Sequence, residues 1–313
     1  MALKKTFSSL IRIVVGFGIL AVILLKTDIF RLWNILKHIN LLWFIGAMAA
    51  YFTAILLSSV RWDILLRPKD IKVKIWPIMK IYLTSLFLAN ILPSGAGLDA
   101  ARGVFMAKAT KQTADSLASV VIDRIFGFIG LILLVLFGIP LKLSGVTAYR
   151  NIALLIAAVL IVGTMASMTR PVFAFVNSVL RRIPYGDKLL KLYQAFYTYR
   201  TEFKVIPAAL GLSVIIQLFL ALQAWFCAAA IGYSLPLAEV VVYVPAINLI
   251  MAIPVSVGGI GLREGGFVVF FSEFSKVMPR EAALTLGILY GISALIVTLL
   301  GAYFLIHSRN GED

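Results

Sequence analysis

The 313-residue chain is 61% hydrophobic and 14% charged, with a mean hydropathy of +1.00. These values exclude a soluble domain of average composition and predict an all-α polytopic membrane protein, with residues 1–313 as a single integral membrane domain. The net charge of +15 comes from cations that cluster between apolar runs, which favours anionic lipid headgroups over nucleic acid as the partner. The single cysteine, Cys227, and the two histidines predict no metal site and no cofactor.

Apolar runs long enough to cross a bilayer predict six transmembrane helices. They cover residues 10–25, 41–60, 117–139, 151–168, 205–231 and 282–306. Two further apolar segments, 76–109 and 239–278, are interrupted by proline and glycine, and we expect both to be re-entrant hairpins. Tryptophans at the ends of predicted spans are expected in the interfacial belt; they are Trp33, Trp43, Trp62 and Trp76.

The two interrupted segments share a pattern. Residues 91–102 read ILPSGAGLDAAR and residues 253–264 read IPVSVGGIGLRE, so in each copy an arginine follows a proline by nine residues, and the copies are offset by 161 residues. Proline and glycine break an apolar helix, and breaks at matching points of two halves indicate a transporter's substrate site. The helix-break residues are Pro93, Gly95 and Gly97 in the first copy and Pro254, Gly258, Gly259 and Gly261 in the second.

Positive charge predicts the topology. If both hairpins turn back, the six cations of residues 61–80 and the seven of residues 170–204 lie on one side, which the positive-inside rule makes cytoplasmic. Both termini are then cytoplasmic in a multi-pass protein of the cell membrane. The two hairpins enter from opposite faces, so the halves 41–139 and 205–306 form an inverted repeat.

Arg102 and Arg263 are the first candidate site residues. If a half-helix begins after each break, its free N–H groups and an arginine in its first turns make an anion site, and a guanidinium grips phosphate bidentately. The alternative is that each arginine snorkels to an interface and fixes the depth of its hairpin. The matched spacing favours the anion site.

Asp123 and Arg124 lie inside the predicted span 117–139, in the run SVVIDRIFGFIGL. An intramembrane charge is costly, and neighbours on a helix point about 100° apart, so each needs another partner. We expect Asp123 to balance Arg102 or Arg263, and Arg124 to add a third cation to the cavity. The alternative is a structural ion pair that locks this span to a hairpin.

Asp99 and Glu264 flank the two arginines, where a carboxylate favours the positive end of a helix. Helix capping is the simple interpretation; the other is that Glu264 offsets the cation or takes up a proton. Polar residues within apolar runs line a pathway or bond across helices; these are Asn90, Gln217, Gln223 and Asn248.

At these residues the chain resembles the lysylphosphatidylglycerol synthase transmembrane, or flippase-like, family. The resemblance rests on residues 92–102 with 107–111, on residues 120–131, and on residues 253–266. Family members usually have Gly-Glu before the first arginine, where this chain has Ala100-Ala101, and Glu-Arg where it has Asp123-Arg124. Asp99 is the candidate to replace the missing glutamate. Members that make lysyl-lipid add a soluble aminoacyl-transferase domain, which this sequence lacks, so the resemblance implies the translocating part.

The sequence therefore predicts a non-enzymatic lipid translocase for an anionic phospholipid or a polyprenyl-phosphate-linked lipid. Arg102, Arg124 and Arg263 would hold the phosphate, with Asp123 and Glu264 beside them. Two alternatives stay open. One is a membrane enzyme that acts on a lipid-linked phosphate, with Asp123 or Glu264 as base. The other is an accessory subunit of a separately encoded synthase or glycosyltransferase; a homo-oligomer is a further arrangement to test.

Overall fold

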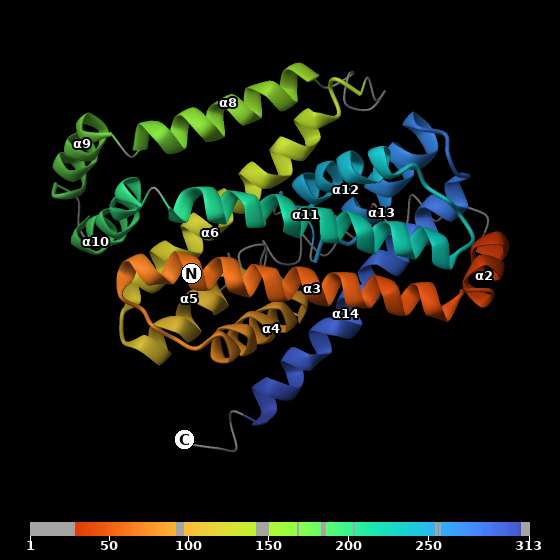
Figure 1. The fold of residues 1–313 in the computed structure, drawn as a ribbon, viewed down its shortest axis with the longest axis horizontal. Coiled ribbons are helices and arrows are strands. Elements are labelled where there is room, and N and C mark those ends of the chain that lie inside the picture. The colour runs from red at the N-terminus through yellow and green to blue at the C-terminus, as the bar shows by residue number, and fades with distance from the viewer. Residues whose placement is uncertain are drawn as a thin grey trace, which may run out of the picture.

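The computed structural model is helical throughout the part of the chain that it describes, residues 29–91, 97–141, 150–167, 169–182, 186–202, 204–253, 256 and 258–307 (Figure 1). The helices are α2 (Ile29–Lys37), α3 (Leu41–Leu66), η1 (Arg67–Lys69), α4 (Ile75–Ile91), α5 (Gly97–Thr110), α6 (Thr113–Phe137), α8 (Arg150–Ser167), α9 (Arg170–Leu180), α10 (Gly186–Tyr197), η2 (Thr198–Thr201), α11 (Val205–Ala230), α12 (Leu237–Met251), α13 (Leu262–Phe267), η3 (Val268–Phe274) and α14 (Arg280–His307). The predicted span 10–25 and the break residues Pro93, Gly95 and Pro254 lie outside the described residues.

Among the described residues, four helical segments are long and apolar enough to cross a membrane. They are Leu41–Lys69, Thr113–Phe137, Val205–Ala230 and Arg280–His307. Each coincides with a predicted span, because a run of apolar residues without proline in its interior favours a continuous helix. The predicted span 151–168 coincides with α8, and the total of six spans stays a prediction.

Helices α3 and α11 run antiparallel and pack along one another (Figure 1). The side chain of Asn40 caps α3 by accepting from the N–H groups of Leu42 and Trp43, and the Asn40 N–H donates to the carbonyl of Ala230 at the end of α11 over 2.8 Å. Further along α3, Arg61 donates to Ser213 on α11 over 2.8 Å. The two helices therefore define an axis: the start of α3 and the end of α11 lie at one end of it, and the end of α3 and the start of α11 lie at the other.

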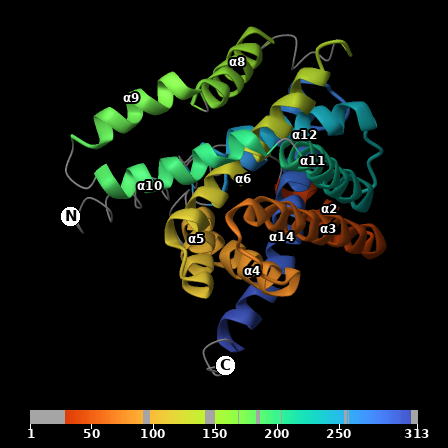
Figure 2. The same cartoon turned by 60° about the vertical axis from the view of Figure 1, so that its left-hand side comes forward.

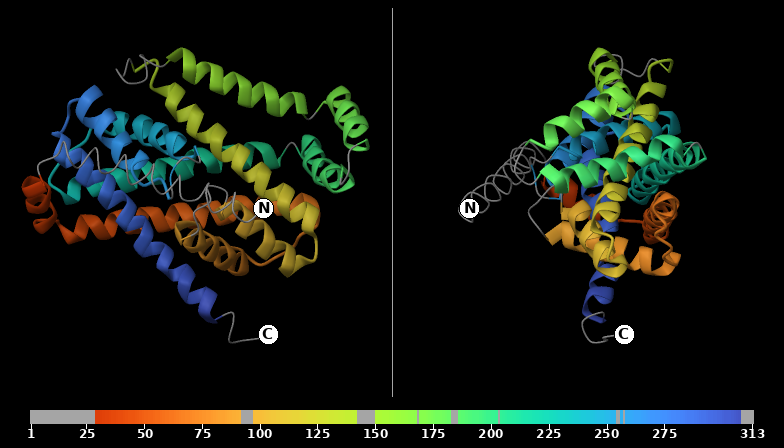
Figure 3. Two further views of the ribbon diagram at one scale, coloured as in Figure 1. Left: turned by 180° about the vertical axis from the view of Figure 1, so that it is seen from behind. Right: turned by 90° about the vertical axis from the view of Figure 1, so that its left-hand side faces the viewer.

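The first interrupted segment forms a helix pair that returns to the end of the axis at which it began. Helix α4 follows the C-terminal end of α3, and α5 packs on α4 and leads into α6. The ion pair between Lys69 and Asp115, at 3.6 Å, ties the connection before α4 to the residues that follow α5. The Thr84 hydroxyl of α4 donates to the carbonyl of Gly301 on α14, which packs against α4 (Figure 3).

The second interrupted segment also forms a returning pair, at the other end of the axis. Helix α12 follows the C-terminal end of α11, and α13 continues into the π-helix η3. The Ser275 hydroxyl, just after η3, donates to the carboxylate of Glu239 in the first turn of α12. The chain therefore leaves this pair beside the point where it entered.

The basic connection 170–204 contains helical structure that sequence analysis did not foresee. Helices α9 and α10 lie outside the central bundle (Figure 2). Phe173 stacks on Tyr197 with ring centroids 4.2 Å apart, which holds the two helices together. Tyr199, in η2, donates to the carbonyl of Leu65; burial raises the pKa of the Tyr199 hydroxyl, so it remains a protonated donor.

Candidate functional site

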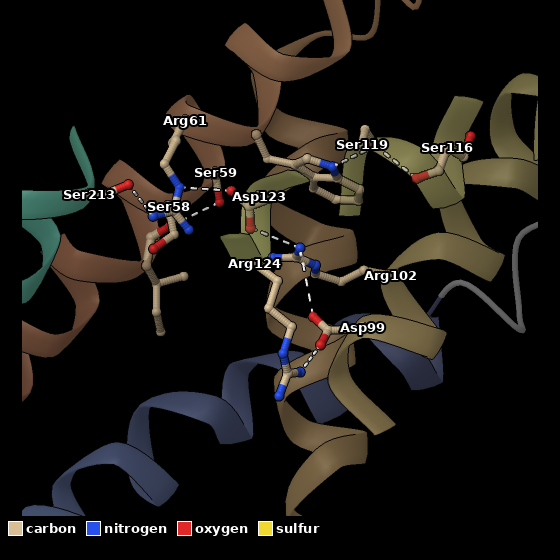
Figure 4. A network of polar contacts seen from close by, with 12 residues as sticks. Ser58, Ser59, Arg61, Asp99, Arg102, Ser116, Ser119, Asp123, Arg124 and Ser213 are labelled. Atoms are coloured by element: carbon tan, nitrogen blue, oxygen red, sulfur yellow. Dashed lines mark hydrogen bonds and ion pairs between the residues drawn. The ribbon is translucent and has the colours of Figure 1, made fainter. Parts of the chain in front are cut away.

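Asp123 is the centre of a buried ionic network on α6 (Figure 4). Its Oδ1 accepts from Arg61 Nε at 2.7 Å, and its Oδ2 accepts from Arg102 Nη2 at 2.9 Å. The three side chains are 2–6% exposed, so both oxygens of a buried carboxylate bind a guanidinium. The expectation that Asp123 balances Arg102 or Arg263 is confirmed for Arg102. Asp123 thus joins α3, α5 and α6.

Aromatic rings hold Arg102 in place. Its guanidinium carbon lies 4.8 Å from the ring centroid of Trp62 and 4.7 Å from that of Tyr82. Trp62 is fully buried and donates from Nε1 to Ser119 over 3.0 Å. The prediction that Trp62 lies in an interfacial belt was therefore wrong, because its ring covers a buried cation. By contrast, Trp33 and Trp76 are about half exposed, at 56% and 49%.

Arg124 points away from Asp123 and pairs with Asp99, in the first turn of α5 (Figure 4). The Arg124 side chain is 38% exposed, whereas that of Arg102 is 2% exposed. Asp99 also lies 3.9 Å from Arg102. Each of the neighbours Asp123 and Arg124 therefore has a separate partner, as their divergence on the helix requires.

Three glycines shape the start of α13. Gly258, Gly259 and Gly261 have φ angles of +59°, +73° and +83°, a region that side chains with a Cβ rarely adopt. The turn leaves the N–H of Gly261 free to donate to Glu264 Oε2 over 2.6 Å. Arg263 Nε donates to Oε1 of the same carboxylate over 3.0 Å. Glu264 therefore both caps the helix and offsets Arg263, whereas proton uptake by Glu264 stays a prediction.

Arg263 lines a cavity of about 250 Å³ between six helices. Its other polar lining side chains are Tyr51, Asn90, Gln217, Asn248 and Tyr290. Arg102 and Arg124 are not among the lining residues, so the expected cavity with three arginines is corrected to one with Arg263. The reason is that Asp123 and Asp99 bind the other two arginines in the first helix pair.

The four amide side chains show both behaviours that the sequence could not separate. Asn90, Gln217 and Asn248 line the cavity, and Asn90 also bonds across helices, since its Nδ2 donates to Thr298 Oγ1 on α14 over 3.0 Å. Gln223 instead bonds across helices, since its Nε2 donates to the carbonyl of Tyr290 over 3.1 Å and to Ser293 Oγ over 2.9 Å. On α11, about one and a half turns therefore separate Gln217, which lines the cavity, from Gln223, which packs between helices.

Arg61 is the residue that sequence reasoning missed, because it was assigned to the basic connection after residue 60. Helix α3 continues to Leu66, and Arg61 is 5% exposed within it. The apolar residues of WDILL after Arg61 were the available signal, since they extend the apolar run past the cation. The described residues contain no group of His, Cys, Asp and Glu that could hold a metal ion.

The sequence is similar to one family of membrane proteins over almost its whole length. The model of the lysylphosphatidylglycerol synthase TM region matches residues 9–301, which is nearly the whole chain. The chain belongs to this family. It is also 25% identical over 248 residues to a UPF0104 membrane protein of Methanothermobacter thermautotrophicus, covering 70% of each chain. No solved structure matches. The residues matched by the family model include both returning helix pairs and the residues that line the Arg263 cavity.

Proposed function

We propose that the protein is a flippase-like lipid translocase of the cell membrane, which moves an anionic phospholipid or a polyprenyl-phosphate-linked lipid between leaflets. The observation that supports it best is the place of Arg263. Its guanidinium stands at the start of a broken helix and lines a cavity to which both returning helix pairs contribute, through Asn90 and through Asn248. Such a cation within apolar helices is suited to a headgroup phosphate.

The two returning pairs are, in this proposal, re-entrant hairpins of an inverted repeat, with both termini in the cytoplasm. The 17 residues of α4 and the 15 of α12 extend about 25 and 22 Å as helices, less than the roughly 30 Å hydrocarbon core. Since the pairs begin at opposite ends of the α3 and α11 axis, each would enter from a different face. Exchange between two such halves gives alternating access to a site between them.

The proposed roles of the charged residues differ. Arg263 holds the phosphate and Glu264 offsets its charge before the lipid arrives. Arg102 and Asp123 fix the first hairpin to α3 and α6, and the half-exposed Arg124 with Asp99 offers a first contact for the headgroup. The acyl chains remain in the bilayer, as expected of a lipid that enters sideways between helices.

Translocation is favoured over an enzymatic role because of how the two carboxylates are bound. Asp123 accepts from two guanidinium groups, and Glu264 accepts from Arg263 and the Gly261 N–H. These donors occupy the carboxylate oxygens with which a general base would have to approach its substrate. A homo-oligomer or a complex with a separately encoded synthase or glycosyltransferase is compatible with this proposal.

The test is lipid transport by purified protein in vesicles, measured as dithionite quenching of acyl-labelled anionic lipids. Arg263→Ala is expected to abolish the protein-dependent transport. The matched control is Arg280→Ala, which removes an arginine that pairs with the half-exposed Glu273 outside the cavity. Equal transport by the wild type and Arg263→Ala across a panel of anionic lipids would contradict the proposed site.

A further inference from the structure

We propose that helix α9 is an interfacial helix, which lies in the membrane surface at one end of the bundle and binds the anionic headgroups of the leaflet on that side. Its partner is the surface of the bilayer and not a ligand of the Arg263 cavity. Such binding does not depend on lipid transport. Three features support it: the position of α9, its exposed side chains and its charge.

The helix before α9 places it at the level of the membrane surface. Helix α8 is the predicted span 151–168, and its side chains Leu155 and Val159 are each 63% exposed, as expected of a surface that meets lipid. Thr169, the N-cap of α9, donates from its N–H to the carbonyl of Ala166 in α8 over 3.0 Å. From there α9 runs across the direction of α3 and α11, at the end of the bundle where α3 ends (Figure 1). This direction is that of a helix in the plane of the membrane surface.

The exposed face of α9 is apolar in its middle. Phe175 and Val179 are four residues apart, so they lie on the same face of the helix, and they are 68% and 41% exposed. Another face is already occupied, because Phe173 stacks on Tyr197 of α10 with ring centroids 4.2 Å apart. Contact with acyl chains would remove the apolar surface of Phe175 and Val179 from water. Their face therefore continues the exposed apolar surface of α8.

Helix α10 has one side for lipid and one for water. Leu189 and Leu192 line an open groove of about 300 Å³ together with Val121 and Ile125 of α6. Exposed polar side chains recur every three or four residues on the other side of α10; they are Asp187, Lys191 and Gln194. An apolar groove against a helix of transmembrane length suits the acyl chains of the same leaflet. The boundary between lipid and water thus passes through the pair of α9 and α10.

The charge of α9 favours an anionic leaflet over a protein partner. Arg170 is the first residue of α9, Arg181 and Arg182 follow its last residue, and all three are exposed. No aspartate or glutamate occurs from residue 124 to residue 186. Cations beside an exposed apolar stripe are typical of helices that bind anionic lipid surfaces. A second copy of α9 packed on this face would bring arginines close to arginines, which disfavours a dimer through it.

The experiment places a fluorescent label on α9 in the full-length protein. The chain has one cysteine, Cys227, which is fully buried, so a new surface cysteine is labelled selectively. Phe175→Cys and, as a second position, Val179→Cys carry an NBD label in nanodiscs with about 30% phosphatidylglycerol in phosphatidylcholine. A nitroxide on the acyl chain quenches a label that meets lipid, and iodide quenches a label that meets water. Gln194→Cys, on the polar side of α10, is the matched control.

The labels on α9 are expected to be quenched by the lipid nitroxide about threefold more strongly than the label of Gln194→Cys, with the opposite order for iodide. In nanodiscs of phosphatidylcholine alone, lipid quenching of the Phe175→Cys label should fall about twofold. Adding Arg181→Gln and Arg182→Gln should cause the same fall. Lys72→Gln with Lys74→Gln removes equal charge from exposed residues before α4 and should leave the quenching unchanged.

Three results would overturn the proposal. Iodide quenching of both α9 labels at the level of Gln194→Cys would show that α9 lies in water. Shielding of both labels from iodide and from the lipid nitroxide would show that a second copy or another protein covers the helix. Lipid quenching that changes neither with the charge of the leaflet nor with the arginine substitutions would contradict the binding of anionic headgroups.

Discussion

The guanidinium of Arg61 on α3 donates to the carboxylate of Asp123 on α6 over 2.7 Å. This contact joins two helices of transmembrane length through residues that are 62 positions apart in the sequence. Arg102 binds the other oxygen of the same carboxylate. One buried anion thus compensates two buried cations from α3 and α5. The first helix pair is held in place by this charge balance as well as by apolar packing.

Asp123→Asn should destabilise the protein strongly, because it leaves two buried guanidinium groups without their anion. The expected loss in the free energy of unfolding is about 3–5 kcal/mol. Thermal unfolding in detergent measures it. Asp63→Asn is the matched control on α3, since its partner Arg67 is 68% exposed and such a pair contributes about 1 kcal/mol or less. Equal melting temperatures for the two variants would refute the central role of Asp123.

Gly291→Ala tests the close contact between α13 and α14. A Cβ atom at this position would collide with the guanidinium of Arg263, so the side chain must leave its place in the cavity. We expect a cost of about 1–3 kcal/mol from overpacking and a large loss of lipid transport. Gly211→Ala on α11 is the control, because an added Cβ at this position would meet no atom within 4 Å. Transport at the wild-type rate by Gly291→Ala would show that Arg263 need not hold this position.

Gly301→Ala tests the packing of α14 on α4. A Cβ here would collide with the backbone carbonyl of Leu83, which cannot move as a flexible side chain can. Small residues allow such close approach of membrane helices. The melting temperature in detergent should fall, whereas Gly163→Ala on α8, with no atom within 4 Å of the added Cβ, should not lower it. An unchanged melting temperature for Gly301→Ala would contradict the close crossing.

The sequence predicted the long helices well and the network poorly, for physical reasons. Apolar runs and proline or glycine breaks are local signals, so the spans and the two interrupted segments match α3, α6, α11, α14 and the returning pairs. The partners of Asp123 depend on which helices pack together. Arg102 was one of two candidates, and Arg61 was missed because a cation at the end of an apolar run resembles a residue of the following connection.

The short helices α9 and α10 show a second limit. Their basic and aromatic residues were interpreted as a connection, since neither segment has the length of a span. In the structure Phe173 stacks on Tyr193 and Tyr197, a long-range contact that local patterns do not reveal. The cavity likewise could not be predicted from Arg263 alone, because Tyr51, Asn90 and Gln217 reach it from three other helices.

Native mass spectrometry of the detergent-extracted protein tests the proposed headgroup site most directly, because it detects a retained lipid without labels. Wild-type protein should carry an anionic phospholipid that is lost from Arg263→Ala and kept by Arg280→Ala. The same anionic lipid retained equally by all three proteins, or no lipid retained by the wild type, would contradict a headgroup site at Arg263.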